Sequence, residues 1–147
     1  MFLYSLMNFD EIKNFNPSNC ISGRVMRLSR ITANIFRKYL KPFGVTDSQT
    51  SILFLVSKHE KGLTQTRITE ILQLEKSSLS RNLKRLVDQN YLMKNNSSEI
   101  VITQSGKKLV ISIIPEWEKA MAEIRSLIGD DGEESLNKVL TNLINKI

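Results

Sequence analysis

The fold is decided by the stretch TQTRITEILQLEKSSLSRNLKRLVD, residues 64–88. Its first part predicts a short helix, because the Thr64 hydroxyl can accept a hydrogen bond from an early backbone N–H and Ile68 begins an apolar side. After a tight break at residues 73–75, leucines recur at helical spacing from Leu79 onward. Two short helices joined by a few residues are the helix-turn-helix pattern.

The second of these helices, expected within residues 75–89, is polar and mostly basic on one face. When Leu79, Leu83 and Leu86 point to the core, at about 100° per residue, the opposite side points outward. A helix of this kind fits the major groove of double-stranded DNA, where Arg, Asn and Ser side chains bond to base edges. The candidates for base contacts are Ser77, Arg81 and Asn82.

Other polar groups around these helices suit the phosphate backbone of DNA. Lysine and arginine side chains bind phosphates regardless of base sequence. Hydroxyl and N–H groups at the start of a helix favour the same anion, and the net charge of +6 fits an anionic partner. The candidates for phosphate contacts are Thr64, Gln65, Thr66, Arg67, Lys76, Ser78, Lys84, Arg85 and Lys94.

Two further helices are predicted before this pair. Apolar residues at helical spacing predict a long helix over residues 19–41, which Pro42 and Gly44 end. Thr46 and Gln49 then form a capping-box pattern, because the threonine hydroxyl and the glutamine side chain can each bond to the other's backbone N–H. A second helix therefore begins after Thr46.

After the helix-turn-helix the hydrophobic period changes. Residues 92–94 and 99–102 predict two strands around a polar turn at residues 95–98, which together form a hairpin, or wing. Thr103 can cap a long helix that follows. Within that helix Pro115 predicts a kink, and Gly129 predicts its end before a last helix over residues 131–146.

These elements predict a mainly α fold with a small β-wing (α+β), built as a winged helix-turn-helix in a single domain of 147 residues. We expect an irregular lead at residues 1–18 and a DNA-binding lobe at residues 46–103. The flanking helices at residues 19–41 and 104–147 expose more apolar positions than one small lobe covers. This surplus permits packing across a partner through Trp117, Met121, Leu136, Leu140 and Leu143, with an intrachain core position as the alternative for Trp117.

The composition argues against other classes of protein. One cysteine and one histidine cannot form an intramolecular disulfide or a Cys/His metal cage, and no nucleophile stands beside a base, so we expect no enzyme, metal or cofactor. No apolar stretch approaches a membrane span, and the opening residues lack a basic signal-peptide region. We expect a cytoplasmic protein without membrane contact that starts at Met1 or Met7.

Several segments resemble the MarR family of bacterial transcription regulators in order and spacing. The similar segments are Val45-Thr-Asp-Ser-Gln49, Leu63-Thr-Gln65, Ile68-Thr-Glu-Ile-Leu72, Ser77-Ser-Leu-Ser-Arg81, Tyr91-Leu92 and Ile102-Thr-Gln-Ser-Gly106. The resemblance covers about residues 20–147. It implies a homodimer whose terminal helices interlock and whose two winged helices bind the halves of a pseudo-palindromic promoter site. It also implies a repressor that is released by a stress signal or by a small phenolic or apolar effector, bound between the dimerisation helices and the DNA-binding lobe.

One departure from the family pattern concerns the wing. Members of the family usually carry a longer wing with arginines at its tip, and these arginines enter the minor groove. Here the tip at residues 95–98 contains no arginine, and only Lys94 beside it is basic. DNA affinity should then depend more on Arg81, Lys84 and Arg85. The alternative function is a dimeric winged-helix adaptor that binds another protein and binds DNA weakly or not at all.

Two further residues have competing interpretations. Cys20 lies near the start of the first long helix, where a helix N-terminus can make a thiol reactive, and some peroxide-sensing members of the family place a cysteine in this neighbourhood. We favour a buried structural cysteine over this redox role. His59 follows the second helix, and we expect a surface or capping role for it rather than a chemical one.

Overall fold

The computed structural model describes residues 9–146, so the choice between Met1 and Met7 as the start lies outside the described residues. The chain divides into two units, one up to Thr32 and one from Ala33 onward. The first contains α1 (Asp10–Asn14), the 3-10 turn η2 (Pro17–Asn19) and the beginning of α2 (Ile21–Leu40). The prediction of an irregular lead is therefore wrong for these residues. Acidic residues in the first turn of α1 and Lys13 in its last turn complement the helix dipole.

The long helix α2 ends as the sequence predicts. It passes into the 3-10 turn η3 (Lys41–Phe43), and Gly44 follows in the left-handed conformation with φ of 67°. Pro42 lies in the first turn of η3, where its missing N–H removes no hydrogen bond. These residues separate α2 from the winged-helix lobe.

The centre of the second unit is α3 (Asp47–Ser57), which packs against α4, α5, α6 and β2. The predicted capping box at its start is confirmed: the Gln49 N–H donates to the Thr46 hydroxyl at 3.2 Å, and the Thr46 N–H donates to the Gln49 side-chain oxygen at 3.1 Å. These two bonds satisfy backbone donors that the first turn of a helix otherwise leaves unpaired.

The helix-turn-helix is formed by α4 (Gln65–Leu72) and α5 (Lys76–Asp88). Thr64 caps α4, because its hydroxyl accepts the Arg67 N–H at 3.2 Å. Gln73 ends α4 with φ of 52° in the left-handed region. The turn thus falls within the predicted break at residues 73–75.

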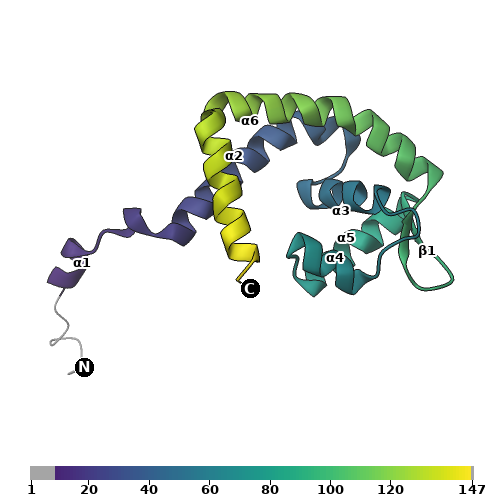
Figure 1. The fold of residues 1–147 in the computed structure, drawn as a ribbon, viewed down its shortest axis with the longest axis horizontal. Helices are drawn as coiled ribbons and strands as arrows, with labels where there is room; N and C mark the ends of the chain where they lie inside the picture. The colour runs from purple at the N-terminus through teal and green to yellow at the C-terminus, as the bar shows by residue number, and fades with distance from the viewer. Residues whose placement is uncertain (1–8, 147) are drawn as a thin grey trace, which may run out of the picture. The chain divides into compact units, whose positions relative to one another are not determined.

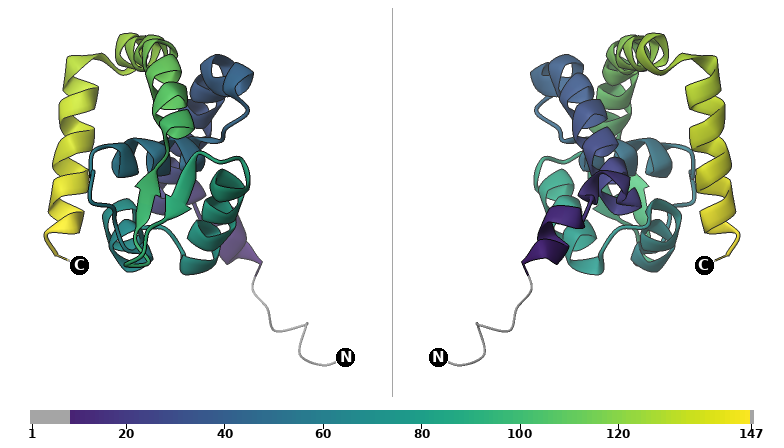
Figure 2. Two further views of the ribbon diagram at one scale, coloured as in Figure 1. Left: turned by 90° about the vertical axis from the view of Figure 1, so that its right-hand side faces the viewer. Right: turned by 90° about the vertical axis from the view of Figure 1, so that its left-hand side faces the viewer.

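The wing consists of β1 (Leu92–Lys94) and β2 (Ile100–Ile102), which pair antiparallel with Met93 opposite Val101 (Figure 2). A bridge between Leu63 and Ile100 ties this hairpin to the segment before α4. Both strands and the turn between them match the sequence prediction within one residue.

The last element is α6 (Gln104–Ile144), which changes direction in its final third (Figure 1). Thr103 caps it through the Gly106 N–H at 2.9 Å. The backbone leaves helical geometry at Gly129, with φ of 69° and ψ of 172°, as predicted. The helical backbone of α6 continues through Pro115. The kink predicted there therefore does not appear as a break in the helix. The exposed position of Pro115 lets water bind the carbonyl that a proline leaves unpaired.

The core lies between α3, the helix-turn-helix, the wing and the first half of α6. Its fully buried side chains include Leu40, Ile52, Leu53, Val56, Ile68, Leu79, Leu86, Leu92, Ile100 and Ile113. Gly106 lets the start of α6 approach the wing, because a Cβ atom there would clash with the Tyr91 carbonyl. Within residues 9–146, no helix is long and apolar enough to cross a bilayer.

Candidate nucleic-acid interface

The helix α5 has one buried and one exposed face. Leu79, Leu83 and Leu86 are 1%, 4% and 0% exposed, which fixes the rotation of the helix on the core. The residues that α5 exposes on the opposite face and its edges include Lys76, Ser77, Ser80, Arg81, Lys84 and Arg85. The predicted basic face therefore lies on the surface of the winged helix.

Ser77 and Arg81 lie one turn apart on this exposed face. No hydrogen bond or ion pair occupies the Arg81 guanidinium within residues 9–146, so its donors are available to a ligand. An arginine presented in this way can bond to guanine O6 and N7 through two parallel hydrogen bonds. Ser77 adds a hydroxyl near the start of the helix, where base edges are within reach of a docked recognition helix.

Asn82, the third candidate for base contacts, is half-buried at the edge of the exposed face. Its side-chain amide donates to the Ser78 carbonyl at 3.0 Å within α5. Asn82 would have to leave this bond before its amide could pair with adenine. The structure therefore brings Ser77 and Arg81 together on the open face but holds Asn82 against its own helix.

Two of the predicted phosphate contacts form ion pairs on the surface. Lys84 Nζ lies 2.7 Å from Asp88 Oδ2, and Arg67 Nη1 lies 3.1 Å from Glu70 Oε2. Exposed pairs of this kind contribute only about 0.3–0.5 kcal/mol each, so a phosphate can displace the carboxylate at little cost. Lys76 and Arg85 are exposed and have no ion-pair partner within the described residues.

The start of α4 offers backbone donors and the exposed Thr66, but not the hydroxyl of Thr64. Thr64 uses its hydroxyl to cap the helix, whereas Thr66 is exposed and Gln65 is half-exposed. The N–H groups of the first turn of a helix have no intrahelical partner, and the helix dipole favours an anion there. Ser78, by contrast, is half-buried, which makes it the weakest of the predicted phosphate contacts.

A shallow groove joins α4, α5 and the wing. Three predicted phosphate contacts from three elements line it, namely Gln65, Lys84 and Lys94. Ser80 lines the same groove and is exposed, but our sequence analysis did not include it among the candidates. The sequence did contain a signal for Ser80 as a candidate, because Ser80 lies one helical turn before Lys84 and on the same edge of α5.

The turn of the wing is held by the side chain of Asn95. Its Oδ1 accepts the Ser97 and Glu99 N–H groups at 2.9 and 3.0 Å, and its Nδ2 donates to Glu99 Oε2 at 3.1 Å. The tip thus has an ordered conformation without carrying a cation. Lys94, at the end of β1, is the basic residue that the wing contributes.

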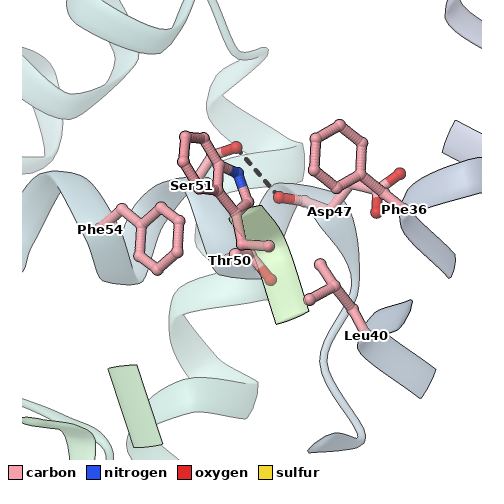
Figure 3. A pocket seen from close by; sticks show the side chains of 7 residues that line it. Phe36, Leu40, Asp47, Thr50, Ser51 and Phe54 are labelled. Atoms are coloured by element: carbon pink, nitrogen blue, oxygen red, sulfur yellow. Dashed lines mark hydrogen bonds between the residues drawn. The ribbon is translucent and has the colours of Figure 1, made fainter. Parts of the chain in front are cut away.

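A second feature of the lobe is a small hollow between the end of α2, the start of α3 and the middle of α6 (Figure 3). Its volume is about 70 Å³. Partial burial raises the pKa of the Asp47 carboxyl in its wall, and the nearby Arg37 guanidinium partly opposes this shift. The residues that line the hollow are Phe36, Leu40, Asp47, Thr50, Ser51, Phe54 and Trp117.

Beside this hollow, α2 and α6 are joined by a polar contact. The Tyr39 hydroxyl donates to Glu123 Oε2, and Lys38 Nζ donates to the same oxygen at 3.0 Å. These two bonds, the tyrosine bond first, lower the pKa of Glu123. Glu123 also raises the pKa of Lys38.

The predicted dimerisation residues fall into two groups. Trp117 packs within its own chain, with its ring edge-to-face against Phe54 at 5.7 Å between centroids, which favours the intrachain alternative. Met121 is half-buried. Leu136, Leu140 and Leu143 are about half exposed on the last part of α6.

The prediction of a buried Cys20 is wrong, because this cysteine is exposed. It precedes α2, and its sulfur accepts the Gly23 N–H at 3.4 Å, which places it at the helix start rather than in the core. The capping role expected for His59 is confirmed. Its Nδ1 lies 2.9 Å from the Leu55 carbonyl oxygen, and because a carbonyl only accepts, Nδ1 carries the proton.

No cluster of His, Cys, Asp or Glu side chains able to hold a metal ion occurs in residues 9–146. No curated protein matches the sequence of this chain. Residues 43–97, from the end of η3 through the wing turn, match the model of the MarR family.

Solved structures share the fold over most of both chains. The transcriptional regulator MosR of M. tuberculosis is 23% identical, with a TM-score of 0.77 over 87% of this chain and 95% of that one. CouR from Rhodococcus jostii RHA1, bound to p-coumaroyl-CoA, is 18% identical, with a TM-score of 0.76 over 88% and 94%. A Mycobacterium tuberculosis MarR family protein in complex with DNA is 15% identical, with a TM-score of 0.63 over 84% and 96%. The winged helix of this chain thus matches the model of the MarR family, and the fold built around it is the fold of solved transcriptional regulators.

Proposed function

We propose that this protein is a sequence-specific DNA-binding transcriptional regulator whose α5 enters the major groove. The observation that carries the proposal is the exposed face of α5, on which the Arg81 guanidinium is unoccupied within the described residues. Gln65, Lys84 and Lys94, from α4, α5 and the wing, line one groove at the edge of α5, where phosphates can flank a docked helix. The similarity to a family member solved in complex with DNA supports this role.

The protein acts, in this proposal, as a homodimer in the cytoplasm. The last part of α6 presents five apolar side chains that are each about half exposed, namely Leu136, Val139, Leu140, Leu143 and Ile144. Contiguous apolar surface of this kind marks a protein interface more often than a free surface. A second copy of the chain would bury it and would offer a second α5 to the other half of a pseudo-palindromic site.

We further propose that the regulator is a repressor that an effector releases from DNA. The hollow lined by Phe36, Asp47, Phe54 and Trp117 is the site for this effector, because it joins α2 and α6 to α3, the central helix of the DNA-binding lobe. A ligand there changes DNA affinity only if it binds one arrangement of these helices more tightly than another. The similarity to CouR, a transcriptional repressor solved with p-coumaroyl-CoA bound, supports a repressor that binds a small molecule.

DNase footprinting with the purified protein on the DNA upstream of its own gene tests the DNA-binding role. We expect a protected segment with two similar half-sites. The absence of protection at low salt, where phosphate contacts are strongest, would contradict it.

The uncharged tip of the wing favours a second function, a dimeric adaptor that binds another protein instead of DNA. Arg81→Ala separates the two functions. The DNA-binding role requires this variant to lose affinity for its DNA site, whereas an adaptor would keep its partner affinity and would show no specific DNA site to lose.

A further inference from the structure

The proposed effector hollow has an unusual distribution of charge. Asp47 is the one charged residue among the seven that line it. The other lining side chains are aromatic, aliphatic or hydroxyl-bearing, and Figure 3 shows those that α2 and α3 contribute. The electrostatic character of the hollow therefore depends on a single carboxylate.

The hydroxyl groups of the hollow act as acceptors toward a ligand. Thr50 donates its hydroxyl proton to the Thr46 carbonyl at 3.0 Å, and Ser51 donates to the Asp47 carbonyl at 3.0 Å. Because both protons are used inside α3, the two oxygens present lone pairs to a bound molecule. The ionised Asp47 side chain likewise only accepts. The polar part of the wall thus suits a ligand that donates hydrogen bonds or carries positive charge.

The aromatic part of the wall suits the same kind of ligand. Phe54 and Trp117 meet edge-to-face with an angle of 81° between their rings, and Phe36 belongs to the same hollow. The faces of such rings attract ammonium groups, most strongly in a partly desolvated site. An anion would find no compensating cation among the lining residues.

The Arg37 guanidinium acts on Asp47 through space but makes no hydrogen bond with its carboxylate. Arg37 Nη1 donates to Asn34 Oδ1 at 2.9 Å, and no side chain of residues 9–146 donates a hydrogen bond to the Asp47 carboxylate. Asp47 also lines a second hollow, and Arg37 and Lys41 belong to that one. An anion would be drawn to that basic hollow and not into the aromatic hollow.

We propose that the hollow binds a small organic cation, with its ammonium group between the Asp47 carboxylate and the rings of Phe36, Phe54 and Trp117. This inference rests on the effector role proposed above and specifies its ligand class. The volume of about 70 Å³ is small beside the roughly 300–1,000 Å³ of a typical ligand pocket. It accommodates a compact ammonium head, while the rest of the ligand extends through the open mouth.

Trp117 provides a direct measurement, because it is the one tryptophan of the chain and it lines the hollow. The full chain is titrated with choline chloride, with its uncharged isostere 3,3-dimethylbutan-1-ol and with sodium benzoate, at constant ionic strength. We expect saturable changes of tryptophan emission with choline and a response at least about tenfold weaker with the other two. An equal response to the uncharged isostere, a tighter response to benzoate, or no response to choline would overturn the proposal.

Asp47→Asn removes the charge while keeping the shape of the side chain. Asp131→Asn is the matched control, because Asp131 is an exposed residue of α6 outside the hollow. We expect Asp47→Asn to weaken choline binding about tenfold, and Asp131→Asn to leave it unchanged. Circular dichroism checks that both variants fold. Unchanged choline affinity in folded Asp47→Asn would overturn the proposal.

DNA binding is measured on the same preparations, so that the two proposals can fail separately. A protein that binds its DNA site but shows no charge-selective response at Trp117 refutes the ligand class and leaves the regulator role standing. A protein that binds choline through Asp47 without binding any DNA site refutes the regulator role and leaves the cation site standing.

Discussion

Arg81 and Lys84 both project from the exposed face of α5, but their surroundings differ. The Arg81 guanidinium has no partner within the described residues, whereas Lys84 is paired with Asp88 and lines the groove beside Lys94. A free, planar guanidinium suits a base edge, and a lysine at the border of the helix suits a phosphate. We therefore assign base recognition to Arg81 and a sequence-independent contact to Lys84.

This assignment predicts different kinds of effect on DNA binding for Arg81→Ala and Lys84→Ala. Arg81→Ala should cost roughly 1–3 kcal/mol on the specific site and relax the preference at one base pair. Lys84→Ala should weaken binding to all DNA sequences about equally. It should also reduce the salt dependence of the binding constant by the amount expected for about one phosphate contact. Fluorescence anisotropy with specific and scrambled duplexes over a salt series measures both effects. Identical loss on both duplexes for Arg81→Ala would contradict the assignment.

Several side chains could not be placed from the sequence, because their positions depend on neighbours that lie far away in the chain. The amide of Asn82 turns back to Ser78, Ser80 opens toward the wing, and Cys20 lies on the surface rather than in the core. The hollow around Asp47 requires α2, α3 and α6 together. Periodicity within one helix does not contain this information.

At the scale of elements, the caps and turns follow from local chemistry and were predictable for that reason. Thr46, Thr64 and Thr103 each cap the helix that the sequence assigns to them. The wing and the break at Gly129 also lie where turn-forming residues interrupt the apolar pattern. The short helix α1 was missed, because its five residues lack the sustained period on which the other helices were recognised.

Thr46→Ala tests the contribution of the capping box to the central helix α3. The substitution removes the side-chain acceptor of the Gln49 N–H, so we expect a loss of about 1 kcal/mol in the free energy of unfolding. Urea unfolding at a fixed protein concentration measures it, because association also affects stability. Thr141→Ala, at an exposed position of α6, is the control and should change stability by less than about 0.5 kcal/mol. Equal effects of the two variants would mean that the cap does not stabilise α3.

The contact between α2 and α6 should make stability depend on pH. The folded protein lowers the pKa of Glu123 below its usual value of 4.5, so the unfolded state takes up the proton first as the pH falls. This stabilisation is present above pH 4.5 and is lost as the pH falls through the lower folded pKa. Glu123→Gln should therefore flatten the acid side of the stability profile. The raised pKa of Asp47 has the opposite effect on the pH dependence of stability, but it affects the wild type and Glu123→Gln equally.

Thermal unfolding of wild type and Glu123→Gln between pH 3 and pH 7 checks this expectation. The difference in stability between them should shrink toward low pH. A constant difference over the whole range would show that Glu123 contributes no charge-dependent stabilisation.

At the scale of the whole molecule, the proposed function needs two copies of the chain. Leu140 lies among the exposed apolar side chains at the end of α6. Leu140→Lys should raise the dissociation constant of the dimer at least about tenfold, because it places a charge in an apolar interface. Asn142→Lys adds the same charge at an exposed polar position nearby and is the control. Sedimentation velocity that shows equal association for both variants would exclude this surface as the dimer interface.

The most direct test of the DNA-binding role is to map the genomic sites that the wild-type protein and Arg81→Ala occupy in cells. We expect the wild type to occupy a pseudo-palindrome whose half-sites lie about one helical turn, or 10 base pairs, apart, since two copies of α5 must reach the same face of the DNA. We expect Arg81→Ala to lose these sites. Occupancy without a shared symmetric sequence, or an unchanged set of sites in Arg81→Ala, would contradict recognition by α5.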